Sequence, residues 1–308
     1  MPHLIIDTDA GIDDAHALMM ALKHPNADIA AITTVNGNVE VEQVTRNVAK
    51  ILDACGVDAP IYQGASAPLV APHFFAKHVH GDDGLGDANL PESPRTAEDE
   101  HAVNALLRMV DDAPGEYTLV ALGPLTNIAL AARLDPTFPS KLNDFIFMGG
   151  TIAAHGNVSF VAEFNIFVDP EATHIVLDSF PMATMLSWET TMQHSIDWNW
   201  VIAWLAADTP LGRFNAAISQ QIINFGKSVG GESAGFAMPD PLAMAVALEP
   251  DIVLEAQTQY MSVELNGTHT RGQTLVDWVD RYKQPHNIRL ITQVNLDRFR
   301  ELLLQTVQ

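Results

Sequence analysis

The sequence of 308 residues contains one cysteine, Cys55, and few basic side chains. A single cysteine excludes an internal disulfide framework and is typical of a reducing compartment, so we expect a cytoplasmic protein. No run of about eighteen apolar residues occurs, and we therefore expect no membrane span. The N-terminus enters an apolar segment without a charged and then apolar leader, so we also expect no secretion signal.

The basic residues are outnumbered by acidic ones, 16 Lys and Arg against 38 Asp and Glu, which gives a formal net charge of −22. Contacts to nucleic-acid phosphates depend on Lys and Arg, so we expect no nucleic-acid partner. The same charge repels strongly anionic ligands at long range, whereas it is compatible with a neutral small molecule.

Four carboxylates are concentrated in residues 4–22, LIIDTDAGIDDAHALMMAL, at positions Asp7, Asp9, Asp13 and Asp14. The apolar run 4–6 predicts a buried strand, and the apolar spacing in residues 15–22 predicts a helix. The carboxylates then lie at the C-terminal end of a strand and in the first turn of a helix. Ligands bind at this place in open α/β sheets.

These carboxylates repel one another and raise each other's pKa unless a positive charge neutralises them. A helix N-terminus supplies only roughly half a unit of charge, and no Lys or Arg precedes Lys23. A divalent cation resolves the repulsion, and an all-oxygen site suits Ca²⁺ or Mg²⁺. One of the four, Asp7, is instead a candidate for a simple helix cap.

Strand-like and helix-like segments alternate along the rest of the chain. Strands are expected at residues 29–35, 117–122, 144–148, 182–186, 258–264 (half-exposed) and 288–291, and helices at 41–52, 102–110, 127–134, from 170, over much of 194–248 and after Asn295. This alternation predicts one α/β domain, residues 1–308, with a mostly parallel central sheet and helices on both faces. Residues 64–94, which contain His73, His78 and His80, predict a long functional loop, and the glycines of 230–235 suggest a mobile flap.

The motif DTDAGIDDAHAL (residues 7–18) resembles the N-terminal signature of the nucleoside hydrolases, the inosine–uridine-preferring N-ribohydrolase group, usually written DxDxGxDDAxAL. Further resembling segments follow in the family's order up to about residue 278: ITTVNGN, VHGDDGLG, LGPLTNIALA, FMGG, GNVSFVAEFNIFVDPEA, DPLAMAVAL and ELNGTHTRGQTLVDW. The resemblance implies a Rossmann-like core, a homodimer or homotetramer, and a role in purine or pyrimidine salvage. It implies Ca²⁺-dependent hydrolysis of the N-glycosidic bond of ribonucleosides, which releases free base and ribose.

The resemblance also implies the metal ligands. Asp9, Asp14 and Asp240 bind Ca²⁺ through their carboxylates, and the backbone carbonyl of Thr126 completes the protein ligands. The ion also holds the ribose 2′- and 3′-hydroxyls and the attacking water, and Asp9 is the general base. Such a site lowers the pKa of the water and stabilises an oxocarbenium-like ribosyl cation with nearby carboxylates.

Substrate contacts follow from the same resemblance. Asp13 hydrogen-bonds the 2′-hydroxyl, and Asn165 with Asp240 holds the 3′-hydroxyl. The remaining ribose contacts are Asn157 and Glu163 at the 5′-hydroxyl, with Asn38 and Met148 lining the ribose site.

Activation of the leaving base is where this chain departs from the family. Many members carry a histidine directly before the late metal-binding Asp, whereas this chain has Pro239, which neither donates a proton nor stacks usefully. His80 matches the family's other base-pocket histidine and is the first candidate to compensate, as a catalytic and base-binding residue. Stacking by Trp188 is a second possibility, and His194 and Trp278 are further ones.

Two other functions compete with this interpretation. Asp7-Thr8-Asp9 imitates the Asp-x-Asp pair of Mg²⁺-dependent phosphatases of the haloacid-dehalogenase type, although Gly11 stands where a Thr is expected. The other alternative is a nucleoside- or ribose-binding pseudoenzyme that lost turnover with the acid at Pro239. Asp9 and Asp13 argue against it, because binding alone does not need a base.

Overall fold

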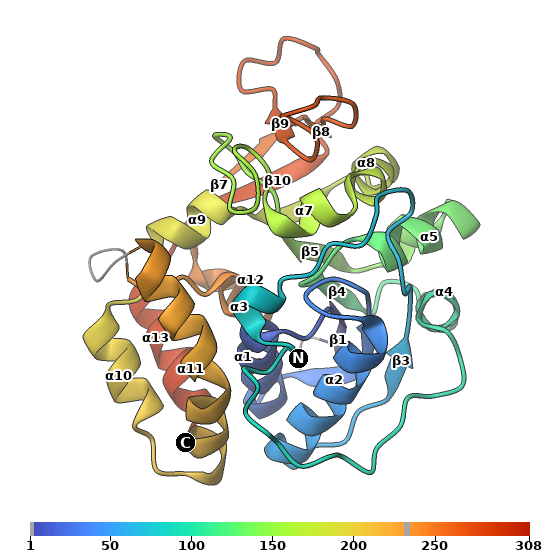
Figure 1. Cartoon of the computed structure of the whole chain (residues 1–308). Coiled ribbons are helices and arrows are strands. Elements are labelled where there is room, and N and C mark those ends of the chain that lie inside the picture. Colours follow the sequence, from blue (N-terminus) through green and yellow to red (C-terminus); the bar gives the residue numbers. More distant parts are fainter. Residues whose placement is uncertain (1–2, 231–234) are drawn as a thin grey trace.

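The first apolar run forms β1 (His3–Thr8), an interior strand of the eight-stranded sheet in the computed structural model, which describes residues 3–230 and 235–308 (Figure 1). The strand order is β3-β2-β1-β4-β5-β6-β10-β7. All neighbouring strands are parallel except β7, which pairs antiparallel with β10 at the sheet edge. The other strands are β2 (Asp28–Thr34), β3 (Ile61–Gln63), β4 (Thr118–Ala121), β5 (Asp144–Met148), β6 (Ala183–Leu186), β7 (Val253–Gln259) and β10 (Ile288–Val294).

Helices cover both faces of the sheet, because successive strand residues point to opposite sides. Leu4 and Ile6 belong to one hydrophobic core and Ile5 to the other. The first core includes residues of α1 (Ile12–Lys23), α2 (Val41–Cys55), α10 (Trp198–Leu205), α11 (Pro210–Gly230), α12 (Pro239–Leu248) and α13 (Leu296–Thr306). The second includes residues of α4 (Ala102–Asp112), α5 (Thr126–Leu134), α6 (Phe138–Lys141), α7 (Phe164–Val168) and α8 (Pro170–Ser179). The predicted α/β class with a mostly parallel sheet is confirmed.

The site is positioned by a reversal of strand order beside β1. The chain builds β2 and β3 on one side of β1, and then returns to build β4, β5 and β6 on the other. Where the connections that follow two neighbouring parallel strands run in opposite directions along the sheet, a crevice forms at the carboxyl ends of these strands, and ligands bind in it. The loops after β1 and β4 meet there, since the Leu122 N–H donates to the Asp7 carbonyl at 2.8 Å.

The half-exposed strand predicted at residues 258–264 is wrong in its bounds. The structure ends β7 at Gln259 and starts a separate hairpin, β8 (Met261–Val263) with β9 (Thr274–Val276), which projects beyond the sheet (Figure 1). The side chain of Asn287 accepts from the Met261 N–H at 2.8 Å and donates to the Met261 carbonyl at 2.9 Å. These bonds tie the start of β8 to an amide side chain and not to a further rung of the sheet.

The segment 64–94 is mostly irregular, as expected, and contains a single helical turn, α3 (Lys77–His80). The remaining elements are α9 (Trp188–Gln193), which follows β6, and the 3-10 turn η1 (Pro250–Ile252). The glycine-rich flap expected at 230–235 falls largely on residues 231–234, which lie outside the described residues. Within the described part of the chain, no helix has the length and apolar character needed to cross a bilayer.

Candidate active site

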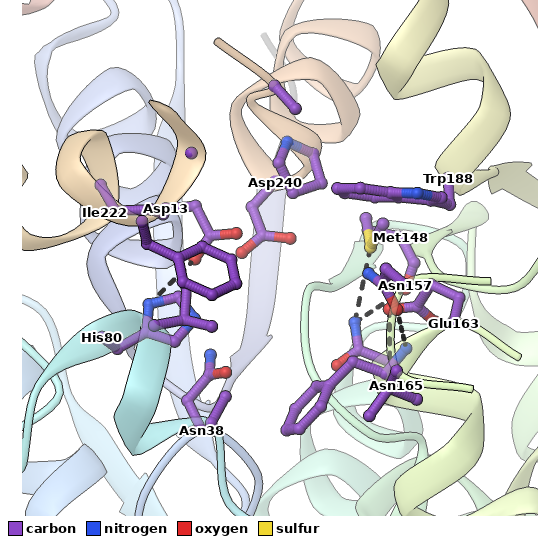
Figure 2. Close-up of a pocket in the computed structure, with 18 of the residues that line it drawn as sticks. Asp13, Asn38, His80, Met148, Asn157, Glu163, Asn165, Trp188, Ile222 and Asp240 are labelled. Atoms are coloured by element: carbon purple, nitrogen blue, oxygen red, sulfur yellow. Dashed lines mark hydrogen bonds and ion pairs between the residues drawn. The ribbon is translucent and has the colours of Figure 1, made fainter. Parts of the chain in front are cut away.

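A cavity of about 410 Å³ opens at the carboxyl ends of the strands, and it brings together side chains from distant parts of the chain (Figure 2). The predicted site residues that line it are Asp13, Asn38, His80, Met148, Asn157, Glu163, Asn165, Trp188 and Asp240. Asp9 and Asp14 are buried beneath this surface. Residues more than 200 positions apart in the sequence therefore face one space, as Asp13 and Asp240 do in Figure 2.

The first turn of α1 is held by Asp14. The carboxylate accepts from the Gly11 N–H at 2.9 Å, and from the hydroxyl of Thr8 at 2.5 Å. The Asn38 amide adds a third donor at 3.1 Å. These bonds fix the direction of Asp14 before any ligand arrives.

The expectation that Asp7 caps this helix is therefore wrong. Asp7 belongs to β1, and its Oδ1 accepts from the Thr33 hydroxyl at 2.5 Å and the Asn127 amide at 2.8 Å. Its side chain thus ties three segments together below the cavity. Burial raises the pKa of this carboxyl to about 7.

Asp9 is held on one oxygen and unpartnered on the other. The Asn38 N–H donates to Oδ2 at 2.8 Å, while Oδ1 is buried without a hydrogen-bond partner. The chain passes so close that a Cβ at Gly37 would lie 2.0 Å from Oδ2, and one at Gly123 would lie 2.7 Å from Oδ1. Burial first, and then the charge of Asp14, raise the pKa of Asp9 well above its usual range. A buried oxygen without a partner needs an explanation, and a ligand bound beside the acidic cluster would supply the missing partner.

Three carboxylates converge at the cavity floor: Asp13, Asp14 and Asp240 each offer an oxygen within 4.8 Å of the others. Burial and the neighbouring carboxylates raise the pKa of Asp240, while burial raises that of Asp13 to about 6. No Lys or Arg is among the described residues that line the cavity. The oxygen donors and the missing positive charge fit a hard divalent cation.

The distances group Asp13 with Asp14 and Asp240, whereas the resemblance assigned Asp9 to that set. Asp9 stands next to the group, since Asp14 and Asp13 both act on its pKa and its own charge acts on Asp240. The structure therefore groups three carboxylates within 4.8 Å and leaves Asp9 beside them.

The structure does not place Thr126 at the cavity. Its hydroxyl donates to Asp169 at 2.7 Å in the first turn of α5. The residue after β4 that does line the cavity is Leu122, whose carbonyl accepts from the Asn165 amide at 2.7 Å. A backbone carbonyl carries no side-chain signal, so the sequence could not single out this position.

The opposite wall is built by the start of α7. Glu163 caps this helix by accepting from the N–H groups of Asn165 at 2.9 Å and Ile166 at 3.3 Å, and it also accepts from the Gly150 N–H at 2.8 Å. Burial raises the pKa of Glu163 to about 7 despite these donors. Asn157 is oriented in a similar way, because its Oδ1 accepts from the Phe164 N–H at 2.9 Å.

His80 faces the acidic cluster in its neutral form. Its Nδ1 accepts from the Ile12 N–H at 3.1 Å and lies 3.7 Å from Asp13 Oδ1. Burial lowers the pKa of the ring to about 4. The bond from Ile12 places the remaining proton on Nε2, so His80 is a hydrogen-bond donor and not a charged acid at neutral pH.

The other predicted base contacts divide into one inside the cavity and two outside. Trp188 lies across the cavity beside Met148 (Figure 2), anchored by its backbone N–H to the Gly150 carbonyl at 3.0 Å. His194 is buried elsewhere: its Nδ1 contacts the Thr190 carbonyl at 2.7 Å and its Nε2 accepts from the Val294 N–H at 3.1 Å. Trp278 is exposed near the projecting hairpin.

One wall of the cavity was missed by sequence reasoning. It is formed by α11, which contributes Ile222, Phe225 and Val229 opposite α3. The apolar periodicity predicted the helix, but it could not show which side of the helix meets the cavity, because that depends on packing against α1 and α10.

The fold and site define a class of protein: a doubly wound α/β protein with a buried cluster of carboxylates, able to hold a cation, at the switch point of its sheet. The family model described as inosine-uridine preferring nucleoside hydrolase matches residues 4–301. The inosine-uridine preferring nucleoside hydrolase of Leishmania major is 36% identical over 307 residues, which span 96% of this chain and 93% of that protein. The non-specific ribonucleoside hydrolase RihC of Salmonella enteritidis is also 36% identical, over 97% of this chain and 95% of its own length.

Solved structures agree over the whole chain. An inosine-guanosine nucleoside hydrolase superposes with a TM-score of 0.92 at 36% identity, and covers 99% of this chain and 98% of its own. A purine-preferring ribonucleoside hydrolase from Gardnerella vaginalis gives a TM-score of 0.91 at 32% identity, with the same coverage. The chain belongs to the inosine-uridine preferring nucleoside hydrolase family. It is an N-glycosyl hydrolase of the ribonucleoside hydrolase type.

Proposed function

We propose that the protein hydrolyses the N-glycosidic bond of ribonucleosides with the help of a bound Ca²⁺ ion, and releases free base and ribose. The observation that carries this proposal is the buried oxygen of Asp9 that has no partner, next to three converging carboxylates. The names of the relatives support the substrate class, since all of them refer to nucleosides or ribonucleosides.

The residues that would hold the ion are Asp9, Asp14 and Asp240, with a backbone carbonyl. For that carbonyl we propose Leu122 in place of Thr126, because Leu122 lines the cavity and precedes Gly123, which touches Asp9. When bound, the ion supplies Lewis-acid chemistry, by lowering the pKa of a coordinated water and orienting two hydroxyl groups.

The protein groups perform the remaining steps. Asp9 accepts the proton of the attacking water, since one of its oxygens is buried without a hydrogen-bond donor. Asp13 and Asp240 hold the ribose hydroxyls, and their charge stabilises the oxocarbenium-like transition state. Asn165 and Asn38 are held in place by their own hydrogen bonds and contact the sugar from two sides.

At the other end of the ribose, we propose that the Asn157 amide and Glu163 bind the 5′-hydroxyl. Met148 and Trp188 close this part of the cavity. A substrate with a 5′-phosphate meets carboxylates here and no described Lys or Arg. The proposed substrate is therefore a nucleoside and not a nucleotide.

The burial of Asp7 weighs against the phosphatase alternative. Its nucleophile would be Asp7, but Asp7 is fully buried in β1 and hydrogen-bonded to Thr33 and Asn127. The binding-protein alternative draws on Pro239 and on the neutral state of His80, which leave the leaving-group proton without an obvious source at either position.

Release of reducing sugar from a panel of nucleosides tests the proposal. The panel contains inosine, guanosine, adenosine, uridine, cytidine and a nitrophenyl riboside. Hydrolysis of at least one natural ribonucleoside is the expected result and also identifies the preferred base. Absence of cleavage of every compound, with binding of nucleoside retained, would favour the binding protein.

The family resemblance supports a further proposal, a homodimer or homotetramer, and the single cysteine, Cys55, supports a cytoplasmic location. Exposed apolar side chains near the β8–β9 hairpin, among them Val279 and Tyr282, are compatible with contacts between subunits. Sedimentation velocity of the purified chain measures the number of subunits.

A further inference from the structure

The departing base needs a proton, and neither Pro239 nor His80 supplies it. Pro239, directly before Asp240, has no proton to give. His80 is turned toward α1, where its Nδ1 already accepts from the Ile12 N–H at 3.1 Å and its ring is buried. A proton donor has to lie elsewhere along the base.

The structure shows on which side of the cavity the base lies. The polar groups proposed to bind the ribose gather around Asp13, Asn165 and Glu163. The rest of the cavity extends between α3 and α11, and its walls there are apolar, with Val79, Ile222, Phe225, Gly226 and Val229. Figure 2 shows Ile222 across the cavity from Asn157 and Glu163. A flat aromatic base fits the apolar side.

His78 stands on that side. It belongs to α3, lines the same cavity, and packs edge-on against Phe225 of α11 with 5.7 Å between ring centres. Its side chain is exposed, in contrast to the buried His80 two residues later. Since residues two apart on a helical turn point in different directions, α3 directs His80 to the acidic cluster and His78 to the base region.

Among the lining residues in segments 3–230 and 235–308, the titratable side chains are three carboxylates and these two histidines. The carboxylates Asp13, Glu163 and Asp240 belong to the ribose and metal region. Among the described lining residues, His78 is therefore the titratable side chain that packs against the apolar wall formed by α11.

We propose that His78 is a catalytic residue that donates the leaving-group proton, an inference that rests on the proposed hydrolysis. The C1′–N bond breaks with its electron pair on the base nitrogen, which takes a proton from the His78 imidazolium. The water oxygen bonds to C1′ and gives its proton to Asp9. Solvent then reprotonates His78 and removes the proton from Asp9, so that water is consumed and neutral base and ribose are formed.

The two lysines nearest His78 along α3 and α11 have partners of their own. On its own turn, Lys77 is paired with Glu40 at 2.8 Å, which directs that positive charge away. On α11, Lys227 lies over the Trp198 ring at 5.2 Å. Across the cavity lie the carboxylates of Asp13 and Asp240.

Two leaving groups separate proton donation from other roles. The variants are His78→Ala and His78→Gln, assayed with the natural ribonucleoside that the wild-type enzyme cleaves fastest and with a nitrophenyl riboside. A nitrophenolate departs without a proton, whereas a nucleobase does not. We expect kcat for the natural substrate to fall about 10²- to 10⁴-fold, while hydrolysis of the nitrophenyl riboside changes by less than about threefold and the melting temperature stays at the wild-type value.

Added imidazole should restore part of the natural-substrate activity of His78→Ala, because position 78 is exposed and a small imidazolium ion can enter there to donate the proton. His73→Ala is the matched control: His73 lies in the same loop segment, contacts Asn36 and does not line the cavity, so both substrates should keep wild-type rates. Unchanged natural-substrate turnover in His78→Ala, or an equal loss with both substrates and no rescue, would overturn the role of His78. Failure of the wild-type enzyme to cleave any ribonucleoside would instead refute the proposed function.

Discussion

The backbone N–H of Asn38 donates to Oδ2 of Asp9 at 2.8 Å and leaves Oδ1 of the same carboxylate buried and unpartnered. One oxygen thus orients the side chain while the other is available to a ligand. Gly37 makes this arrangement possible, because any side chain there would collide with Asp9. The geometry is prepared by the fold, and it predicts where single changes act.

Asp9→Asn should remove activity without unfolding the protein. An amide preserves the shape and the bond from Asn38, but it does not accept a proton from water. We expect kcat to fall by at least about 10²-fold. The melting temperature of the metal-free variant should equal or exceed that of the metal-free wild type, because a buried carboxylate without a full set of partners is lost. Near-normal turnover of the purified variant would refute the role of Asp9 as base.

The enzyme should reject 2′-deoxyribonucleosides. A site with Asp13, Asp240 and a cation facing the sugar hydroxyls leaves several polar groups unpaired when one hydroxyl is missing. The expected decrease in kcat/KM is roughly 10⁴-fold for 2′-deoxyinosine relative to inosine. Comparable rates for the two compounds, measured at equal enzyme concentration, would show that the acidic cluster does not bind the ribose.

Asp7→Asn should change how stability depends on pH. The pKa of Asp7 is raised to about 7 in the folded protein from 3.8, so the folded state binds more protons than the unfolded state between these values. Its carboxyl therefore disfavours the native state progressively as pH rises from about 4 to about 7. Relative to the variant, the wild type should lose up to about 4 kcal/mol over this range. Urea unfolding at several pH values, with a chelator present, measures the difference; parallel curves would contradict the assignment.

His194→Ala should reduce stability and leave catalysis intact. His194 connects α9 to β10 through the Val294 N–H at 3.1 Å, and it lies outside the cavity. Loss of the ring leaves that buried N–H unpaired, which should lower the free energy of unfolding by about 2 kcal/mol or more. Urea unfolding and kcat measured at 25 °C separate the two properties. A large fall in kcat with an unchanged unfolding midpoint would reinstate His194 as a base contact.

The sheet could be predicted because apolar runs such as 29–35 and 144–148 report burial directly. The exact ends of the individual strands could not be predicted. The break between β7 and β8 at Tyr260 depends on Asn287, which comes from a distant part of the chain. The short edge strand Ile61–Gln63 has too few residues to show a period.

The acidic half of the site was predictable for a similar reason: Asp9, Asp13 and Asp14 are close in sequence, so their repulsion is evident without a structure. The apolar wall was not predictable, because Phe225 and Ile222 are ordinary helix residues until α11 packs against α1. The same holds for Leu122, which offers only a backbone carbonyl.

The central claim is that the buried carboxylates act through a bound cation on the ribonucleoside bond. The most direct measurement is the rate of ribose release from the best natural ribonucleoside in the panel, first after dialysis against a chelator and then after addition of excess Ca²⁺. If a bound cation is required, chelation should abolish ribose release and added Ca²⁺ should restore it. A rate that is unaffected by complete removal of metal, verified by elemental analysis, would contradict it.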